Sequence, residues 1–567
     1  MIDLLSFILF VTIYIFLPGY ALLSLKKSKF NLENIFLSFS VGLVVFTLFS
    51  YLFELIGAQH GNKLYLITLL GLLLFTKGYT SLNKIKLRRL TKSEVYTSLL
   101  IIAGSLYLTL PTIRSGTVWK GGLGYWGALG HDGIWHEALI KQLINQVPPR
   151  NPIYSSSILS NYHYYYDLLV AETTQIANVG IQDLLYRYYP LLFSILLGVG
   201  SYILLKRLFK NNYFIVLTSL FVIYFGSSFG WIVTYLKDKT LSGESVFWMN
   251  QTYSFNINPP FAISLVIFIA IAVLLMRYLT KPILVDSFLL VLLSGVLIEF
   301  KVYAGILVLG GMLLLAIQEA LKNKKYSLMK ISVGSIVLAG ILYLPQNISS
   351  SNLVVFEPLW FTHSMIDAPD RVGWERLSIA RQVYASQGVW VKLVLAEILA
   401  FTIFIVGNMG TRILSFFGYF KVIKEEVKKV NTHSFLIYVS IISFILPMLF
   451  IQRGNSWNTI QFGYYFLYIS AIYTGYGLYL ISKKLPKVAS TLLIVSFLVL
   501  TPISSISNLF NLFNPPNYVI AKEEVEALTA LSFMEDGIVL IGPGCDANTY
   551  CSNNICPGHC FDENAYV

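Results

Sequence analysis

Apolar runs recur along almost the whole chain, and many extend for about 18 to 25 residues, the length of a helix that crosses a bilayer. A segment inside a bilayer must satisfy its own backbone hydrogen bonds, and a helix does so. The runs are too long and too continuously apolar to be tilted barrel strands. The sequence therefore predicts an all-α polytopic membrane protein.

We predict about 14 transmembrane helices, at residues 3–25, 32–56, 64–80, 94–113, 184–205, 212–236, 257–280, 283–299, 302–320, 330–346, 389–411, 433–451, 463–481 and 488–508. Only 12% of the residues are charged, about half the usual share in soluble domains, which supports this class. The first span has no basic leader and no small-residue cleavage site, so we expect it to be retained as an anchor.

Lysine and arginine orient the helices, because short loops rich in these residues stay cytoplasmic. More than half of the 41 basic residues fall in one set of alternate short loops, which include Lys206, Arg207, Lys210, Arg277 and Lys281. We therefore expect a plasma-membrane protein with both termini, loop 114–183, loop 347–388 and segment 509–567 outside the cytoplasm. The net charge of +12 mostly records the inner loops and gives no reason to expect nucleic-acid binding.

The chain divides into a transmembrane domain, residues 1–508, and an outer C-terminal segment, residues 509–567. In that segment, Glu523–Leu531 is typical of a helix and Gly537–Ile541 of a strand, which predicts a small α/β unit with a truncated or atypical end. Its cysteines, Cys545, Cys551, Cys556 and Cys560, favour two disulfides of undetermined pairing, with a zinc site that includes His559 as the alternative.

Loop 114–183 concentrates titratable and aromatic residues. Ile134–Val147 alternates apolar and polar side chains at helical spacing, and Asp167–Val179 is too polar to cross, so we expect two helices that lie at the membrane interface. Asp132 and His136 are four residues apart and would share a helix face. A carboxylate beside an imidazole can act as a general base or bind a cation, but Asp132 could equally be a helix cap.

Two stretches of this loop carry a resemblance to a known family. They are Gly130-His131-Asp132-Gly133-Ile134-Trp135-His136 and Asn161-Tyr162-His163-Tyr164-Tyr165-Tyr166. With the layout of the spans, they resemble the GT-C superfamily of polytopic glycosyltransferases, which includes protein O-mannosyltransferases and the aminoarabinose transferase. The resemblance implies a polyprenyl-phosphate-linked sugar donor, transfer on the outer face and a catalytic acidic residue at Asp132.

The chain departs from that family in two respects. The acidic loop follows the fourth predicted helix, whereas many members have it after the first, and there is no Asp-Asp or Asp-x-Asp pair. No cofactor is identified by these motifs, and a divalent cation stays an alternative.

A lipid phosphate leaving water must be paired with cations near the outer membrane boundary. Lys301, beside Glu299 in a tight outer turn, is one candidate, although a local ion pair or a snorkelling lysine would explain it equally well. Arg453 is a second, with Trp457 placed to stack on a sugar or prenyl unit, but a plain interfacial arginine is as common. Glu397 lies inside an apolar span, which marks it as a functional suspect.

The leading hypothesis is a membrane glycosyltransferase in which Asp132 deprotonates the acceptor, a glycan, lipid or protein. Asp132 and His136 would be catalytic, and a second set would bind substrate: His131, Glu137, Tyr162, His163, Tyr164, Lys301, Arg453 and Trp457. One alternative is a transporter or flippase of lipid-linked glycans, for which Glu397 would be a charge inside the helix bundle. Another is a surface polysaccharide polymerase or ligase, which shares the donor chemistry.

Overall fold

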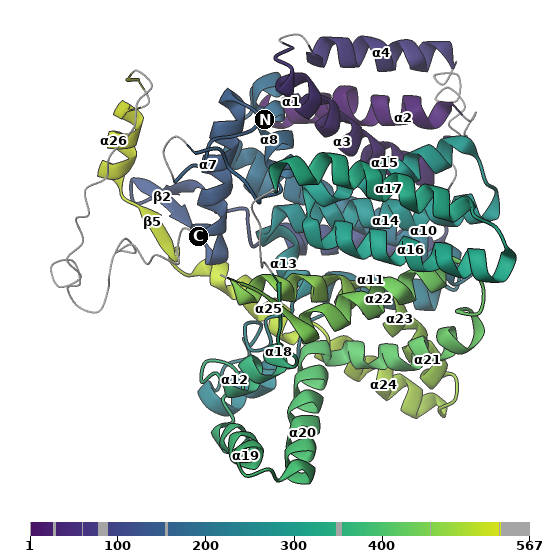
Figure 1. The fold of residues 1–567 in the computed structure, drawn as a ribbon. Coiled ribbons are helices and arrows are strands. Elements are labelled where there is room, and N and C mark those ends of the chain that lie inside the picture. Colours follow the sequence, from purple (N-terminus) through teal and green to yellow (C-terminus); the bar gives the residue numbers. More distant parts are fainter. Residues whose placement is uncertain are drawn as a thin grey trace.

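Helices make up most of the chain in the structure, a computed structural model that describes residues 2–25, 30–58, 61–76, 89–153, 157–347, 354–453, 455–531 and 533–534 (Figure 1). Within these residues, nine helical stretches are long and apolar enough to cross a membrane. They are Ile2–Ser24, Leu32–Leu55, Ile181–Leu208, Pro259–Thr280, Val302–Asn323, Ser327–Gln346, Trp390–Glu425, Thr432–Leu449 and Lys487–Ser507. The described part of the chain is therefore a multi-pass membrane protein.

Four further predicted crossings are helices that do not meet these limits. Two are short, α4 (Gly61–Phe75) with 15 residues and α15 (Leu284–Phe300) with 17, and two are less apolar, α6 (Lys92–Thr109) and α23 (Gln461–Ser482). The count of 14 crossings therefore stays a prediction.

The crossing predicted at 212–236 is broken in the structure. It consists of α11 (Tyr213–Phe225) and α12 (Gly230–Asp238), bent by 45°, and counting this pair as one span gives ten candidates among the described residues. At the break, the Gly226 carbonyl oxygen accepts hydrogen bonds from the Thr252 hydroxyl, at 2.6 Å, and from the buried Arg412 guanidinium, at 3.1 Å. These bonds satisfy the backbone where the helix stops.

The first half of the bundle surrounds α14 (Pro259–Thr280), which is apolar on every face and buried over almost its whole length. Such a helix belongs in a core. It contacts α3 (Leu32–Leu55), α10 (Tyr189–Leu208), α15, α16 (Val302–Asn323) and α22 (Thr432–Leu449). Asn258 caps α14 by accepting from the Phe261 amide, and two prolines open the helix.

Loop 114–183 folds into two strands and two main helices. The strands β1 (Thr117–Trp119) and β2 (Gly122–Tyr125) are antiparallel, and they precede α7 (Asp132–Asn145) and α8 (Tyr165–Ala177). Both helices lie within two residues of their predicted bounds. The helix α8 packs into the core against α1 (Ile2–Phe10), α3 and α7, and its position at the membrane interface stays a prediction.

The C-terminal segment joins the same sheet. Its strand β5 (Tyr518–Ile520) pairs antiparallel with β2, so that Gly124 lies opposite Val519, and α26 (Lys522–Leu531) follows as predicted (Figure 1). The strand predicted at 537–541 and the four cysteines, with His559, lie outside the described residues.

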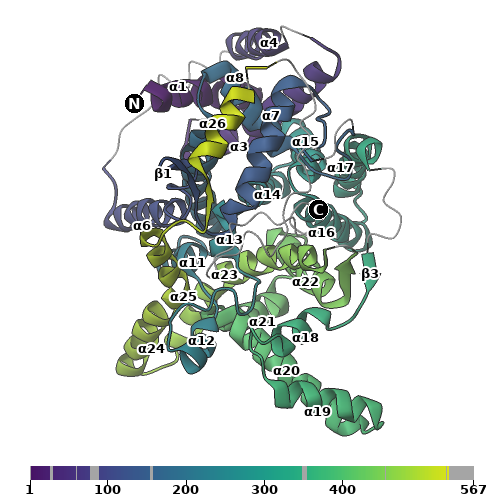
Figure 2. The ribbon, with the colours of Figure 1, turned by 90° about the vertical axis from the view of Figure 1, so that its left-hand side faces the viewer.

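Residues 360–409 form an arm that projects from the bundle in both views (Figures 1 and 2). The arm consists of α18 (Trp360–Asp367), α19 (Glu375–Ser386) and α20 (Trp390–Met409). At its base, β3 (Val354–Phe356) pairs antiparallel with β4 (Phe450–Gln452).

The remaining elements complete the bundle and its loops. The helices and helical turns are η1 (Val11–Phe16), α2 (Leu17–Ser24), η2 (Gly127–Gly130), α9 (Ile181–Asp183), η3 (Leu184–Tyr188), α13 (Gln251–Ile257), α17 (Ser327–Tyr343), η4 (Leu344–Gln346), η5 (Gly410–Leu414), α21 (Ser415–Glu425), η6 (Ser456–Ile460), α24 (Lys487–Leu500), α25 (Ile503–Phe510) and η7 (Asn511–Phe513).

Gly42 lies at a close contact between helices in the N-terminal half. It lies in α3 against the π-helical turn η1, where a Cβ atom would overlap the Ile15 carbonyl oxygen. We expect Gly42→Ala to reduce the free energy of unfolding in detergent by about 1–3 kcal/mol. Gly71→Ala is the control, because a Cβ atom at Gly71 meets open space. Equal stability of the two variants would contradict this packing.

Candidate functional site

A buried pair of side chains joins α7 to α8. Nδ1 of His136 lies 2.6 Å from Oδ1 of Asp167, and the two residues are 6% and 0% exposed. Asp167 is in the first turn of α8, where the helix dipole favours a carboxylate. Its other oxygen, Oδ2, is buried and accepts no hydrogen bond from the described residues. One carboxylate oxygen therefore stays available within the core.

Asp132 does not pair with His136, although the two share the spacing that the sequence suggested. Its Oδ1 lies 2.8 Å from Nδ1 of His131, and both side chains are at least half exposed. The buried Asp167 carboxylate takes the His136 hydrogen bond instead. Asp132 is therefore a solvent-accessible carboxylate at the first turn of α7.

Lys301 is buried in the turn between α15 and α16, at 4% exposure. Its Nζ donates to Oδ1 of Asn258 at 3.2 Å and lies 5.5 Å from the centre of the Tyr303 ring. Burial lowers the pKa of Lys301 to about 7, although the carboxylates of Asp132 and Asp167 act in the opposite direction. Lys301 therefore lies within electrostatic range of both carboxylates and forms no ion pair with a described residue.

His163 and Tyr162 belong to the same cluster, because Lys301 and His136 both act on His163. Their rings stack with centres 5.0 Å apart, and Tyr162 meets Trp135 edge-on at 5.7 Å. Nε2 of His163 is buried and without a hydrogen-bond partner among the described residues. Burial lowers the pKa of His163 well below its ordinary value, and Lys301 and His136 act in the same direction. His163 is therefore a neutral imidazole, and the fully buried Tyr164 follows it.

Glu137 points to a different part of the fold. Its carboxylate accepts from Gln182 Nε2 and from the Tyr186 hydroxyl, each at 2.7 Å. Burial raises the pKa of Glu137, while these two hydrogen bonds lower it. Because its partners lie on α9 and η3, Glu137 holds α7 in place.

Arg453 and Trp457 lie at the edge of the cluster. Arg453 is exposed and follows Gln452, whose side chain accepts from the Tyr303 hydroxyl at 3.3 Å. Trp457 packs against Trp248 and Trp360, with ring centres 4.7 and 5.1 Å away. The guanidinium of Arg371 covers Trp248 at 4.8 Å and Trp457 at 5.9 Å. Trp248, Trp360, Arg371 and Trp457 therefore form a second, aromatic and cationic group.

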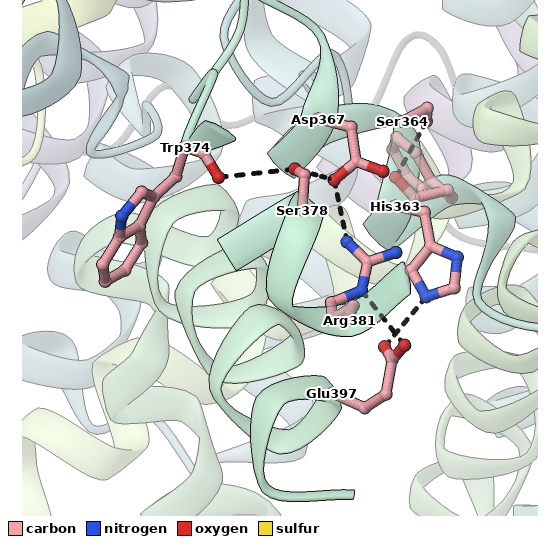
Figure 3. A network of polar contacts seen from close by, with 8 residues as sticks. His363, Ser364, Asp367, Trp374, Ser378, Arg381 and Glu397 are labelled. Atoms are coloured by element: carbon pink, nitrogen blue, oxygen red, sulfur yellow. Dashed lines mark hydrogen bonds and ion pairs between the residues drawn. The ribbon is translucent and has the colours of Figure 1, made fainter. Parts of the chain in front are cut away.

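The apolar span around Glu397 suggested an isolated carboxylate. In the structure, the carboxylate has two partners. It accepts from Arg381 Nε at 3.0 Å and lies 2.8 Å from His363 Nε2, and Arg381 also binds Asp367 (Figure 3). These contacts join α18, α19 and α20. Glu397 therefore braces the projecting arm.

Three further residues of the cluster were not identified from the sequence. Asp167, Asn258 and Tyr303 contact or face His136 and Lys301. In the sequence, only the position of Asp167, a single acidic residue directly after a run of tyrosines, could have marked it as a site residue. Within the described parts of the chain, no three His, Cys, Asp or Glu side chains gather closely enough to hold a metal ion.

No family model and no curated protein matches this chain. Among solved structures, it is similar to the oligosaccharyltransferase of Archaeoglobus fulgidus. The apo form shares 14% identity over 78% of this chain and 58% of that chain, with a TM-score of 0.46. The form described in complex with an inhibitory peptide and a dolichol-phosphate shares 13% over 74% and 55%, with a TM-score of 0.42. The chain thus spans less than two thirds of that protein.

The burial of Lys301 predicts how stability depends on pH. Between about pH 7 and pH 10, unfolded Lys301 binds a proton that the folded form does not, so stability rises with pH. We expect Lys301→Met to remove up to about 1.4 kcal/mol per pH unit from this slope, measured by denaturant unfolding in detergent. Lys141→Met, at an exposed lysine of α7, is the control. A slope unchanged by Lys301→Met would show that the amine is hydrated.

Proposed function

We propose that this protein is a membrane glycosyltransferase that moves a sugar from a polyprenyl-phosphate-linked donor to an acceptor outside the cytoplasm. The observation that carries the proposal is the buried Lys301 amine within range of the accessible Asp132 carboxylate. The Lys301 amine can bind a phosphate, and the Asp132 carboxylate can accept the proton of a hydroxyl group. Sugar transfer from a lipid phosphate needs both at one place.

Asp132 is the general base of the proposed reaction. Its carboxylate takes the proton of the acceptor hydroxyl, and the acceptor oxygen forms a bond to the anomeric carbon of the sugar. The bond between that carbon and the phosphate oxygen breaks, and polyprenyl phosphate leaves with the electron pair. Positioned bases of this kind contribute about 10²- to 10⁴-fold to a rate. His131, bonded to Asp132, orients the carboxylate.

Lys301 stabilises the departing phosphate, where negative charge grows during the reaction. An ammonium held away from water gains more from an anion than an exposed one does. A bound phosphate also raises the pKa of Lys301, so that the lysine carries its charge when the donor is present. Arg453, exposed beside Gln452, is placed to supply a second cation at the rim.

The other residues of the cluster shape the site. The His136–Asp167 pair fixes α7 against α8 and so sets the place of Asp132, and Glu137 does the same from the other side. Tyr162 and the neutral His163, whose rings stack, would bind substrate together with Tyr164. Trp457, within its group of tryptophans, offers a face on which a sugar or prenyl unit can stack.

The charge of the loops supports the direction of transfer. The basic loops at the opposite ends of α10 and α14 are expected in the cytoplasm, which puts this cluster, loop 114–183 and both termini outside. The acceptor is a glycan, a lipid or a protein.

The two alternatives differ in what would be observed. A transporter of lipid-linked glycans draws no support from Glu397, because Arg381 and His363 bind its carboxylate. A polysaccharide polymerase or ligase would use the same cluster but transfer a whole glycan. The mass of the transferred group separates that reaction from transfer of one sugar.

The test is Asp132→Asn in protein reconstituted with lipid and supplied with a labelled polyprenyl-linked sugar and candidate acceptors. We expect transfer to fall by at least about 100-fold, because the amide cannot accept the proton, while donor binding is kept. Asp238→Asn, at an exposed acid of α12, is the control and should transfer normally. Full activity of Asp132→Asn would exclude Asp132 as the base, and labelled flux across the bilayer without transfer would favour a transporter.

A further inference from the structure

A cavity of about 910 Å³ lies at the ends of α3, α10 and α14 and at the start of α15. Its polar lining includes Glu33, Lys206, Arg207, Arg277, Lys281 and Asp286. Cavities of about 300–1,000 Å³ are typical of small-molecule sites, so this one has the volume for a ligand.

The cavity and the candidate functional site lie at opposite ends of the same helices. In α14, Asn258 precedes the first residue and contacts Lys301, whereas Arg277 and Thr280 line the cavity near the last residue. In α15 the order is reversed, with Asp286 near its start and Lys301 directly after its end. The 22 residues of α14 place the two sites about 30 Å apart, at 1.5 Å per residue. That distance is about the thickness of a hydrocarbon core.

Ion pairs fix one wall of the cavity. Arg277 is 9% exposed in its side chain and binds Asp286 at 3.0 Å, with Glu33 at 3.7 Å. Asn34 also accepts from Arg277, at 3.2 Å, and Arg207 pairs with Glu33. These contacts connect α3, α10, α14 and α15. The cationic side of the cavity is therefore built from interlocked side chains.

Three lysines add positive charge that the described carboxylates do not neutralise. Lys206 donates to the Tyr202 hydroxyl at 3.2 Å, and Lys210 and Lys281 are exposed at the rim. None of the three forms an ion pair with a described carboxylate. The two acids of the lining are both engaged by arginines, so an entering anion would meet a surplus of cations.

Part of the lining is apolar and consists of Leu32, Ile203, Met276 and Ile283. A site for a soluble anion needs no such surface. A lipid presents an anionic head group and, directly below it, the first atoms of its hydrocarbon chains. Basic pockets between transmembrane helices on the cytoplasmic side suit such head groups.

We propose that this cavity binds the phosphate-bearing head group of an anionic membrane lipid. Its phosphate lies among Lys206, Lys210 and Lys281, and its glycerol and upper chains lie against Leu32, Ile203 and Met276. The occupied site ties together the ends of α3, α10, α14 and α15. The proposal does not depend on the transferase reaction, since it concerns the other end of the helices.

The test compares two triple variants of the full-length protein in detergent. One is Lys206→Gln with Lys210→Gln and Lys281→Gln, and the control is Lys483→Gln with Lys484→Gln and Lys487→Gln, three exposed lysines at another loop expected on the same side. Binding of phosphatidylglycerol and phosphatidylcholine is measured by native mass spectrometry and by thermal shift. We expect the cavity variant to bind phosphatidylglycerol about tenfold or more weakly than the control variant does.

Equal phosphatidylglycerol binding by the two variants, or equal binding of phosphatidylcholine and phosphatidylglycerol by the wild type, would overturn the proposal. Glycerol phosphate and inorganic phosphate separate the two sources of phosphate, because a soluble ligand that binds as tightly as phosphatidylglycerol and displaces it would exclude the lipid. If the cavity variant does not fold, salt replaces it as the test. Phosphatidylglycerol binding to the wild type should weaken as salt screens the lysines. An affinity that does not change with salt concentration would overturn the proposal.

Discussion

The burial of one ammonium group, that of Lys301, shapes the part of the fold that we assign to chemistry. Moving a charge out of water is costly unless it is paired, and here the nearest described partners are the neutral Asn258 oxygen and the Tyr303 ring. The carboxylates of Asp132 and Asp167 act on it from a distance. The ammonium group therefore lacks an ion-pair partner among the described residues, and an anion such as a lipid phosphate would supply one.

The frame that holds Lys301 is the central group of helices. The apolar surface of α14 brings α3, α10 and α15 together, and these helices carry both the candidate functional site and the basic cavity at their two ends. At one end a single buried lysine faces acids, and at the other several cations face two acids that are already paired. The two ends therefore differ in charge and in access, as expected of a protein whose two faces meet different solutions.

The sequence predicted what depends on local patterns. Long apolar runs located the helices, and the span predicted at 257–280 is α14, Pro259–Thr280. Contacts between residues that are far apart in the sequence could not be predicted from local patterns. His136 and Asp167 are 31 residues apart, and Asn258 and Lys301 are 43 apart, so only the fold brings them together. The break after Phe225 also depends on Arg412 from a remote segment. Glu397 was suspected because its partners, Arg381 and His363, were not visible from the apolar span around it.

The role of Lys301 can be tested with a structure of the protein with a bound polyprenyl phosphate in a lipid nanodisc. We expect a phosphate oxygen about 2.7–2.9 Å from Nζ of Lys301, the distance of a charge-assisted hydrogen bond, with the Asp132 carboxylate facing the same space. A phosphate bound only in the basic cavity at the opposite ends of the helices, with Lys301 still bonded to Asn258 alone, would contradict it.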